Sequence, residues 1–209
     1  MERKPVGGKI RNIERSRKKF LLAVGKILKT KGHAGLKINE VAKVAGVDKK
    51  MIYSYFGGLD GLIDEYIAVK DFWSNVKAEQ STGAITDGGK AFATKAFLYQ
   101  FDYLENNKEF QKLLLWRLSE ERKSLRKLTQ DQEARGELLF NHFTDPYFGK
   151  NAEKFRAISA VIASGLYYLN MYAEVNGSVF SGIDLKTEKG RNLIKEAVGF
   201  IIDKSFKDL

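Results

Sequence analysis

Apolar residues recur every three or four positions along most of the chain, which is the spacing of amphipathic helices. In the N-terminal third, this pattern predicts helices at residues 13–31, 38–45, 48–56 and from Leu59 into the late 70s. Gly46 separates the two short helices, and Ile52 and Phe56, four positions apart, turn the second of them toward a core. Asp48 can accept a backbone N–H at the start of that helix. We therefore expect a small group of helices that contains a tight glycine turn.

The rest of the sequence shows only helical periods. A turn-rich segment, QSTGAITDGG at 80–89, separates it from the N-terminal helices. The predicted helices cover residues 90–106, 108–118, 120–143, 152–175 and 186–207. No alternating strand pattern of useful length interrupts them. The chain is therefore predicted to be all-α, with an N-terminal three-helix helix-turn-helix domain and a larger C-terminal helical domain.

Charge is distributed unevenly along the 209 residues. The first 58 residues hold 15 Lys or Arg against 4 Asp or Glu, a net charge of +11, and the remaining residues bring the total to +10. A basic block of this kind attracts a polyanion, either nucleic acid or an anionic membrane surface. A lysine-rich solvated face without a partner is the alternative interpretation.

Several classes of chemistry have no residues to support them. The chain contains no cysteine, which excludes disulfides, thiolate catalysis and cysteine-based zinc sites and fits a reducing cytoplasm. Beyond His33 and His142 there is no histidine, and no phosphate-cradling glycine loop or nucleophile elbow is visible. Glu120 and Glu121 do not face each other on a helix, so they do not form a catalytic carboxylate pair. We expect a cytoplasmic protein that is not an enzyme, crosses no membrane and holds no metal or cofactor.

The stretch from Val41 to Gly58, VAKVAGVDKKMIYSYFGG, follows core positions with cationic and hydrogen-bonding groups. Helical spacing places Lys50, Tyr53 and Ser54 on one outward face. Lysine can donate to guanine or phosphate, serine can pair with several bases, and tyrosine hydroxyls suit phosphate oxygens. Two short helices joined by a glycine turn on a basic block predict a helix-turn-helix that reads the major groove of DNA. Half-buried packing is the alternative role for the tyrosines.

From Gly32 to Leu62 the chain resembles the N-terminal domain of TetR-family transcriptional regulators. The matching runs are Val41-Ala42, Ala45-Gly46-Val47 and Ile52-Tyr53-Ser54-Tyr55-Phe56, followed by Leu62. The resemblance implies a homodimer whose third helices enter two major grooves of a near-palindromic operator, roughly 34 Å or a larger multiple of a turn apart. Together with the motif, it gives the expected DNA-binding residues as Lys37, Lys49, Lys50, Tyr53, Ser54 and Tyr55.

Three positions depart from the family pattern. Lys37 stands where the family usually has a Thr or Ser that caps the second helix, and lysine can neutralise a phosphate but cannot accept the cap hydrogen bond. Lys50 and Met51 replace small residues at the start of the recognition helix, which leaves the operator sequence open. Leu59 stands where a phosphate-contacting lysine often follows the phenylalanine.

The expected domains follow from these patterns. Residues 1–12 form a flexible basic arm, 13–58 the helix-turn-helix domain, 59–79 a connecting helix, and 80–209 a helical effector-binding and dimerisation domain. The arm has two open interpretations, which are contact with the minor groove and no role in binding.

Aromatic residues are frequent between residues 90 and 175, and the resemblance implies a small-molecule pocket among these helices. The candidate pocket residues are Phe97, Gln100, Phe101, Trp116, Phe140, His142, Tyr167 and Asn170. Ordinary core packing is the alternative. The candidate dimer-interface residues are Ser164, Gly165, Tyr168, Tyr172, Leu193, Ala197 and Ile201, for which an intramolecular helix pair is the alternative.

The predicted function is that of a TetR-like ligand-responsive transcriptional repressor. It would bind double-stranded DNA as a homodimer and release its operator when it binds a small molecule of unknown identity. An architectural DNA-binding dimer without an effector is the alternative. A third class is a helical enzyme or lipid-surface protein in which the basic block serves only for docking. The sequence offers no motif for this class.

Overall fold

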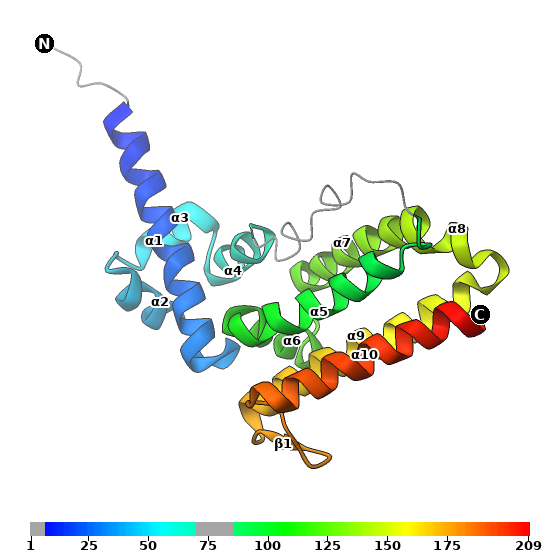
Figure 1. Ribbon diagram of the computed structural model, residues 1–209. Helices are drawn as coiled ribbons and strands as arrows, with labels where there is room; N and C mark the ends of the chain where they lie inside the picture. Colours follow the sequence, from blue (N-terminus) through cyan, green and yellow to red (C-terminus); the bar gives the residue numbers. More distant parts are fainter. Residues whose placement is uncertain (1–6, 70–85) are drawn as a thin grey trace, which may run out of the picture. The chain divides into compact units, whose positions relative to one another are not determined.

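The computed structural model describes residues 7–69 and 86–209, with side chains from Arg11 onward. The regular structure of these residues is helical apart from one short β-hairpin, so the all-α prediction is confirmed (Figure 1). The chain forms two compact units. Within the described residues, the unit that we call the head contains 7–69 and 112–128, and the unit that we call the body contains 86–111 and 129–209.

The head is built around the predicted N-terminal helices. Its elements are α1 (Gly7–Lys31), the 3-10 turn η1 (His33–Gly35), α2 (Ile38–Ala45), α3 (Lys50–Phe56) and α4 (Leu59–Ala68). Its fully buried side chains come from each of the four α-helices and include Phe20, Val24, Leu28, Val41, Ile52, Leu62 and Tyr66. The apolar stripes read from the sequence therefore meet in one core.

The first helix of the head begins earlier than predicted. Helix α1 begins at Gly7, so residues 7–12 are helical where we expected a flexible arm. The described part of α4 ends at Ala68, and its predicted continuation through Trp73 lies outside the described residues. The first six residues of the arm and most of the predicted loop at 80–89 also lie outside them.

The body contains the remaining helices. Helix α5 covers Lys90–Asn106, α6 (Lys108–Ser119) begins in the body and continues into the head, and α7 (Lys123–Leu139) begins in the head and continues into the body. A π-helical segment, η3 (Phe140–Thr144), then leads to α8 (Asp145–Phe148) and the short η4 (Gly149–Asn151). The last elements are α9 (Ala152–Val175), β1 (Val179–Phe180), β2 (Ile183–Asp184) and α10 (Glu188–Asp208).

Helices α5, α9 and α10 lie side by side and share one apolar core (Figure 1). Its buried members are Phe101, Ile162, Leu166, Val198 and Ile202. A second buried cluster of Ala93, Phe148 and Phe155 joins α5 to α8 and α9. Long apolar stripes on these three helices thus account for most of the packing within the body.

The β-hairpin is a feature that the sequence pattern missed. Its strands pair antiparallel, with Val179 opposite Asp184 and Phe180 opposite Ile183. The Phe180 ring packs edge-on against Tyr168 and Tyr172 of α9. A strand of two residues is too short to show alternation, so the segment could be read only as a break between helices.

Among residues 7–69 and 86–209, no helix is both long enough and apolar enough to cross a membrane.

Candidate nucleic-acid interface

The turn between α2 and α3 has the backbone that its sequence requires. Gly46 adopts a left-handed conformation with φ 63°, which favours glycine because it lacks a Cβ. Asp48 Oδ1 accepts the backbone N–H of Lys50 at 2.8 Å, as expected for the start of the recognition helix. Gly57, with φ 73°, ends α3 in the same left-handed region. The predicted helix-turn-helix is therefore present over residues 38–57.

Helix α3 divides its side chains between the core and an outward face. Ile52 is fully buried, whereas Tyr53 is 60% exposed and Ser54 is also exposed. Lys49 and Lys50 are exposed at the start of the helix, and Lys49 Nζ lies 3.3 Å from Asn39 Oδ1 of α2. This face offers cationic and hydroxyl donors at positions that a partner can reach. DNA contact by these side chains stays a prediction.

The remaining expected contact residues are Lys37, which precedes α2, and Tyr55 of α3. Lys37 is exposed and occupies the N-cap position of α2, where its side chain makes no cap hydrogen bond, as its chemistry requires. Tyr55 is half-buried, which fits the packing role left open for it.

Arg17 of α1 is a residue of this interface that the sequence analysis missed. It donates from Nη1 to the backbone carbonyl of Tyr55 at 2.6 Å, and its guanidinium lies 4.5 Å from the centre of the Phe56 ring. It also pairs with the carboxylate of Glu65 in α4. A cation at the last turn of α3 interacts favourably with the helix dipole. The available signal was its position, three residues before Phe20 on the core-facing stripe of α1.

Five of the eight predicted pocket residues come together in the body. Phe97, Gln100 and Phe101 lie on α5, and Tyr167 and Asn170 lie on α9. Gln100 is buried and donates from Nε2 to the hydroxyl of Tyr167. Asn170 is also buried and donates from Nδ2 to the carbonyl of Leu166 at 2.9 Å. The polar members of this group are thus bonded to the protein itself.

The other three predicted pocket residues lie outside this group. Trp116 belongs to the head, where its buried ring stacks on the imidazole of His33 with centroids 5.3 Å apart. Phe140 lies beneath the guanidinium of Arg156 at 5.2 Å, near the second apolar cluster. His142 is exposed, and its ring packs perpendicular to that of Phe143 with centroids 4.9 Å apart. Aromatic frequency predicted burial for most of these residues, but it did not indicate which cluster each one joins.

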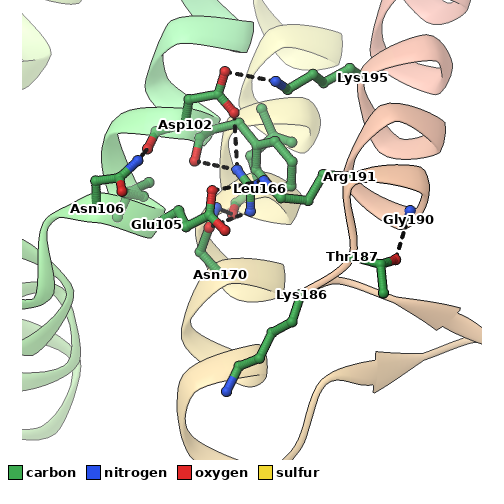
Figure 2. A network of polar contacts seen from close by, with 12 residues as sticks. Asp102, Glu105, Asn106, Leu166, Asn170, Lys186, Thr187, Gly190, Arg191 and Lys195 are labelled. Carbon is green, nitrogen blue, oxygen red and sulfur yellow. Dashed lines mark hydrogen bonds and ion pairs between the residues drawn. The ribbon is translucent and has the colours of Figure 1, made fainter.

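A buried arginine connects α10 to α5 and α9 in the body (Figure 2). Arg191 Nη2 lies 3.1 Å from Asp102 Oδ1, and Arg191 Nε lies 2.9 Å from Glu105 Oε2. Arg191 Nη1 donates to Asn170 Oδ1 at 3.3 Å, and the guanidinium lies 3.9 Å from the centre of the Phe101 ring. One cation thereby satisfies polar groups from two other helices, as burial of a charge requires.

Asp102 also forms an ion pair with Lys195, whose Nζ lies 2.7 Å from Asp102 Oδ2. Partial burial raises the pKa of Asp102, but hydrogen bonds from Lys195 and Arg191 outweigh it and hold the pKa below its usual value. The spacing of Arg191 and Lys195, four residues apart, was the only sequence signal for this network.

Helices α9 and α10 expose a row of apolar and small side chains, beside which Glu196 and Lys204 of α10 are also exposed. Val161 is 72% exposed and Phe200 is 63% exposed, which are high values for large apolar side chains. The predicted dimer residues Ser164, Gly165, Tyr168, Leu193, Ala197 and Ile201 are exposed on the same two helices, and Tyr172 is half-buried. We call Val161, Ser164, Gly165, Tyr168, Leu193, Ala197, Phe200 and Ile201 the uncharged face. Sequence reasoning missed Val161 and Phe200, although they continue the same helical stripes.

Metal chemistry finds no support in the part of the chain that the structure describes. No group of three or more His, Asp or Glu side chains there could hold a metal ion.

Comparison with known proteins gives a match at the level of structure. Two solved structures of NalD, a TetR-family protein and the secondary repressor of the MexAB-OprM multidrug efflux pump in Pseudomonas aeruginosa, resemble the chain. The TM-scores are 0.52 and 0.51, the sequence identities are 20% and 17%, and each match covers 90% of this chain and 95% of NalD. The chain has the TetR fold. Neither a family model nor a curated protein sequence matches it.

The TetR fold agrees with the order of the elements. An N-terminal helix-turn-helix unit precedes a larger helical unit, as the resemblance of residues 32–62 implied. At 17–20% identity the likeness concerns the fold, and function has to be argued from the residues of this chain.

Proposed function

We propose that the protein is a TetR-type transcriptional repressor that reads double-stranded DNA as a homodimer and responds to a small molecule. The observation that carries the proposal is the outward face of α3. Lys50, Tyr53 and Ser54 are exposed there, while Ile52 of the same helix is fully buried in the head. A helix that is anchored by one side and presents donors on the other has the form of a major-groove reader.

The charge of the N-terminal residues supports a nucleic-acid partner. The net charge of +11 lies in the first 58 residues, which include the whole helix-turn-helix. Cationic side chains release condensed counterions when they meet phosphates, and this release supplies much of the affinity for DNA. The chain shares its fold with NalD, which is a repressor, with TM-scores of 0.52 and 0.51. This likeness supports a role in repression.

The uncharged face supports a second copy of the chain as the partner of the body. Apolar patches of this kind on a soluble protein mark interaction sites. Two-fold symmetry requires a self-complementary surface, and Ser164 and Gly165 beside Tyr168 allow helices to approach closely. A dimer through α9 and α10 would present two copies of α3 to one near-palindromic operator.

Selection of bound sites from random DNA tests the DNA-reading proposal. We expect a near-palindrome whose half-sites are separated by one or more helical turns. Binding to that site should weaken linearly on a log–log plot as salt rises, because counterions are released. No enrichment over random sequence at any salt concentration would contradict the proposal.

Substitution of Tyr53 by Ala locates the reading face. The variant should lose about tenfold in affinity for the selected site, because an exposed donor of the recognition helix is removed. Tyr99 of α5 is a matched control, since it is also an exposed tyrosine but belongs to the body. Gel-shift titrations of both variants should separate them. Equal affinities for Tyr53→Ala and Tyr99→Ala would place the reading face elsewhere.

One observation favours the architectural alternative, a DNA-binding dimer without an effector. Gln100 and Asn170, the buried polar side chains of the candidate pocket, are already bonded to Tyr167, Leu166 and Arg191. A ligand would have to displace these bonds, and buried polar groups left without partners cost about 1–3 kcal/mol each. A thermal-shift screen of small molecules, followed by operator titration with each binder, distinguishes the two. A repressor with an effector should yield a binder that lowers operator affinity.

A further inference from the structure

A single arginine connects the start of α7 to the start of α4 inside the head. Arg122 donates from Nε to Asp64 Oδ1 at 2.9 Å and from Nη1 to Asp60 Oδ1 at 3.1 Å. Its Nη2 donates to the backbone carbonyl of Asp60 at 2.9 Å and lies 2.8 Å from Asp64 Oδ1. Ser124 Oγ donates to the same oxygen of Asp64 at 2.8 Å. We call these four residues the Arg122 clamp.

Arg122 is more buried than the cation of an ordinary surface ion pair, whereas the side chains of Asp60 and Asp64 are 89% and 52% exposed. Only 14% of the Arg122 side chain is exposed, and its guanidinium lies 5.8 Å from the centre of the buried Trp116 ring. Isolated exposed pairs contribute little to stability. A planar guanidinium that bonds two carboxylates and a backbone carbonyl together fixes direction as well as distance. The segment that carries it is also anchored by the buried side chains of Leu113, Leu114 and Leu125.

The start of α4 is in close backbone contact with the recognition helix. A Cβ atom added to Gly61 would overlap the carbonyl oxygen of Phe56, the last residue of α3. Gly61 lies between the two aspartates that Arg122 holds. The first turn of α4 therefore cannot move toward Phe56 unless the C-terminal end of α3 also moves. Arg17 holds that same end of α3 from the side of α1.

We infer that Arg122 is a positioning residue that keeps the recognition helix in its DNA-reading orientation through the first turn of α4. The inference rests on the proposed DNA-reading function of α3. It also makes residues 112–128 a structural part of the reading head, although they lie about 50 residues beyond α4 in the sequence. Both ends of this segment continue into the body along α6 and α7. A change of conformation in either helix thus has a covalent path to the clamp.

A second role for Arg122 makes the opposite prediction. Asp60 and Asp64 are exposed carboxylates next to the recognition helix, and Arg122 neutralises charge that would repel phosphates. If neutralisation were its role, removing the Asp64 carboxylate would raise affinity for all DNA. If positioning is its role, the same change lowers affinity for the selected operator. Asp64→Ala separates the two roles without placing a poor helix former in α4.

The experiment compares four variants of the full-length protein: Arg122→Met, Arg126→Met, Asp64→Ala and the double variant Arg122→Met/Asp64→Ala. Arg126 is the matched control, because it lies one turn further along α7 and its ion pair with Glu121 is exposed on both sides. Each variant is titrated with the selected operator and with random DNA of equal length. Hydrogen exchange of residues 50–64 is measured on the free proteins, so the clamp is tested even without DNA.

Arg122→Met should lower operator affinity on the order of fivefold more than Arg126→Met does, with similar small losses on random DNA. Asp64→Ala should also weaken operator binding, and the double variant should be no worse than Arg122→Met, since the two side chains act as a pair. Exchange at residues 59–64 should rise in Arg122→Met and Asp64→Ala but not in Arg126→Met. Equal behaviour of Arg122→Met and Arg126→Met in both readouts would overturn the inference.

The remaining outcomes also decide between explanations. A rise in affinity for all DNA in Asp64→Ala would replace positioning by neutralisation. If the clamp variants exchanged faster but the wild-type protein bound no DNA, the proposed function and the positioning role would both be refuted. The contact between Arg122 and the start of α4 would still be supported. If Arg122→Met did not fold, Asp64→Ala would still test the inference, because it keeps the arginine and removes only its partner.

Discussion

The head and the body offer different surfaces to a partner. The head has an apolar core and exposes Lys37, Lys49 and Lys50 around the recognition helix. The body buries Arg191 among Asp102, Glu105 and Asn170 and presents an uncharged face on α9 and α10. The exposed cations of the head remain hydrated until a polyanion supplies their counter-charge. Arg191 of the body is already paired within the fold, and the apolar side chains exposed on α9 and α10 suit a partner that covers apolar surface.

This contrast indicates that the two units bind through different physical effects. Binding by the head should depend steeply on salt, because it exchanges counterions for phosphates. Association of the body should depend weakly on salt, because it removes apolar surface from water. Variants that alter one unit and leave the other intact therefore test whether the two units bind through different effects.

The largest expected effect comes from a charge placed on the uncharged face. Gly165 lies within α9, and a Cβ atom added there meets nothing within 4 Å, so Gly165→Glu fits the folded chain. In a dimer through this face the carboxylate would be buried without a partner. We expect the dimer dissociation constant to rise about a hundredfold or more. Sedimentation equilibrium measures this change, and operator affinity should fall with it.

Gly136→Glu is the matched control for this variant. Gly136 lies in α7, and an added Cβ meets nothing within 4 Å there either. The control should remain dimeric with unchanged operator binding. A dimer in Gly165→Glu as stable as that in Gly136→Glu would show that the uncharged face is not the interface.

The second largest effect should arise where α3 and α4 touch in the head. Gly61→Ala introduces a methyl group against the carbonyl of Phe56, and backbone cannot yield as a flexible side chain can. We expect the head to lose about 2–4 kcal/mol of stability, in the range of overpacked cores. Hydrogen exchange should become faster throughout residues 50–68 and stay unchanged in α9 and α10. Gly136→Ala, which has open space, should show no loss, and equal stability of both variants would refute the close contact.

Much of this fold was predictable because its signals are local. The predicted helices at 38–45, 90–106 and 152–175 have the observed bounds, since apolar stripes end there at Gly46, the Asn106-Asn107 pair and the NGSVFSG segment. The exposed residues of α3 followed from the positions of Ile52 and Phe56. The earlier start of α1 did not, because residues 7–12 carry no apolar stripe that would indicate a helix.

The tertiary contacts of Arg122 and Trp116 could not be predicted from the sequence pattern. Arg122 stands in the charged run LSEERKSLRKLTQDQEARGE, which has the composition of a solvated helix. Its partners, Asp60 and Asp64, lie about 60 residues away, and helical periodicity gives no information on contacts at that distance. Trp116 illustrates the same point, because its aromatic character predicted burial but not its stacking on His33. Tertiary pairing of charged side chains therefore required the structure.

A third, smaller effect should follow from removing the buried charge of the body. Arg191→Met keeps an unbranched apolar side chain but removes the guanidinium, and it leaves Asp102 and Glu105, which are partly exposed, to be solvated. We expect a loss of about 2 kcal/mol in the stability of the body, below the cost of a fully buried unpaired charge. Urea unfolding gives the free energy, with Arg126→Met as the control. A variant as stable as the control would mean that the network contributes no net stability.

The smallest expected effect concerns Asp102 and acid. Its pKa is lowered in the folded protein by hydrogen bonds from Lys195 and Arg191, which outweigh the effect of burial. The ionised carboxylate therefore stabilises the fold above its ordinary pKa of about 3.9, and this contribution is lost as the pH falls through the lower, folded value. Asp102→Asn should reduce stability at pH 7 by less than about 1 kcal/mol, because the pair is partly exposed. The difference in stability between wild type and variant should shrink as the pH falls below about 4, and urea unfolding at pH 7 and pH 3 measures it. The control is Asp131→Asn, at an exposed position of α7, which should not reproduce this change. A difference that stays constant across this range would show that the carboxylate gains nothing from its two cationic partners.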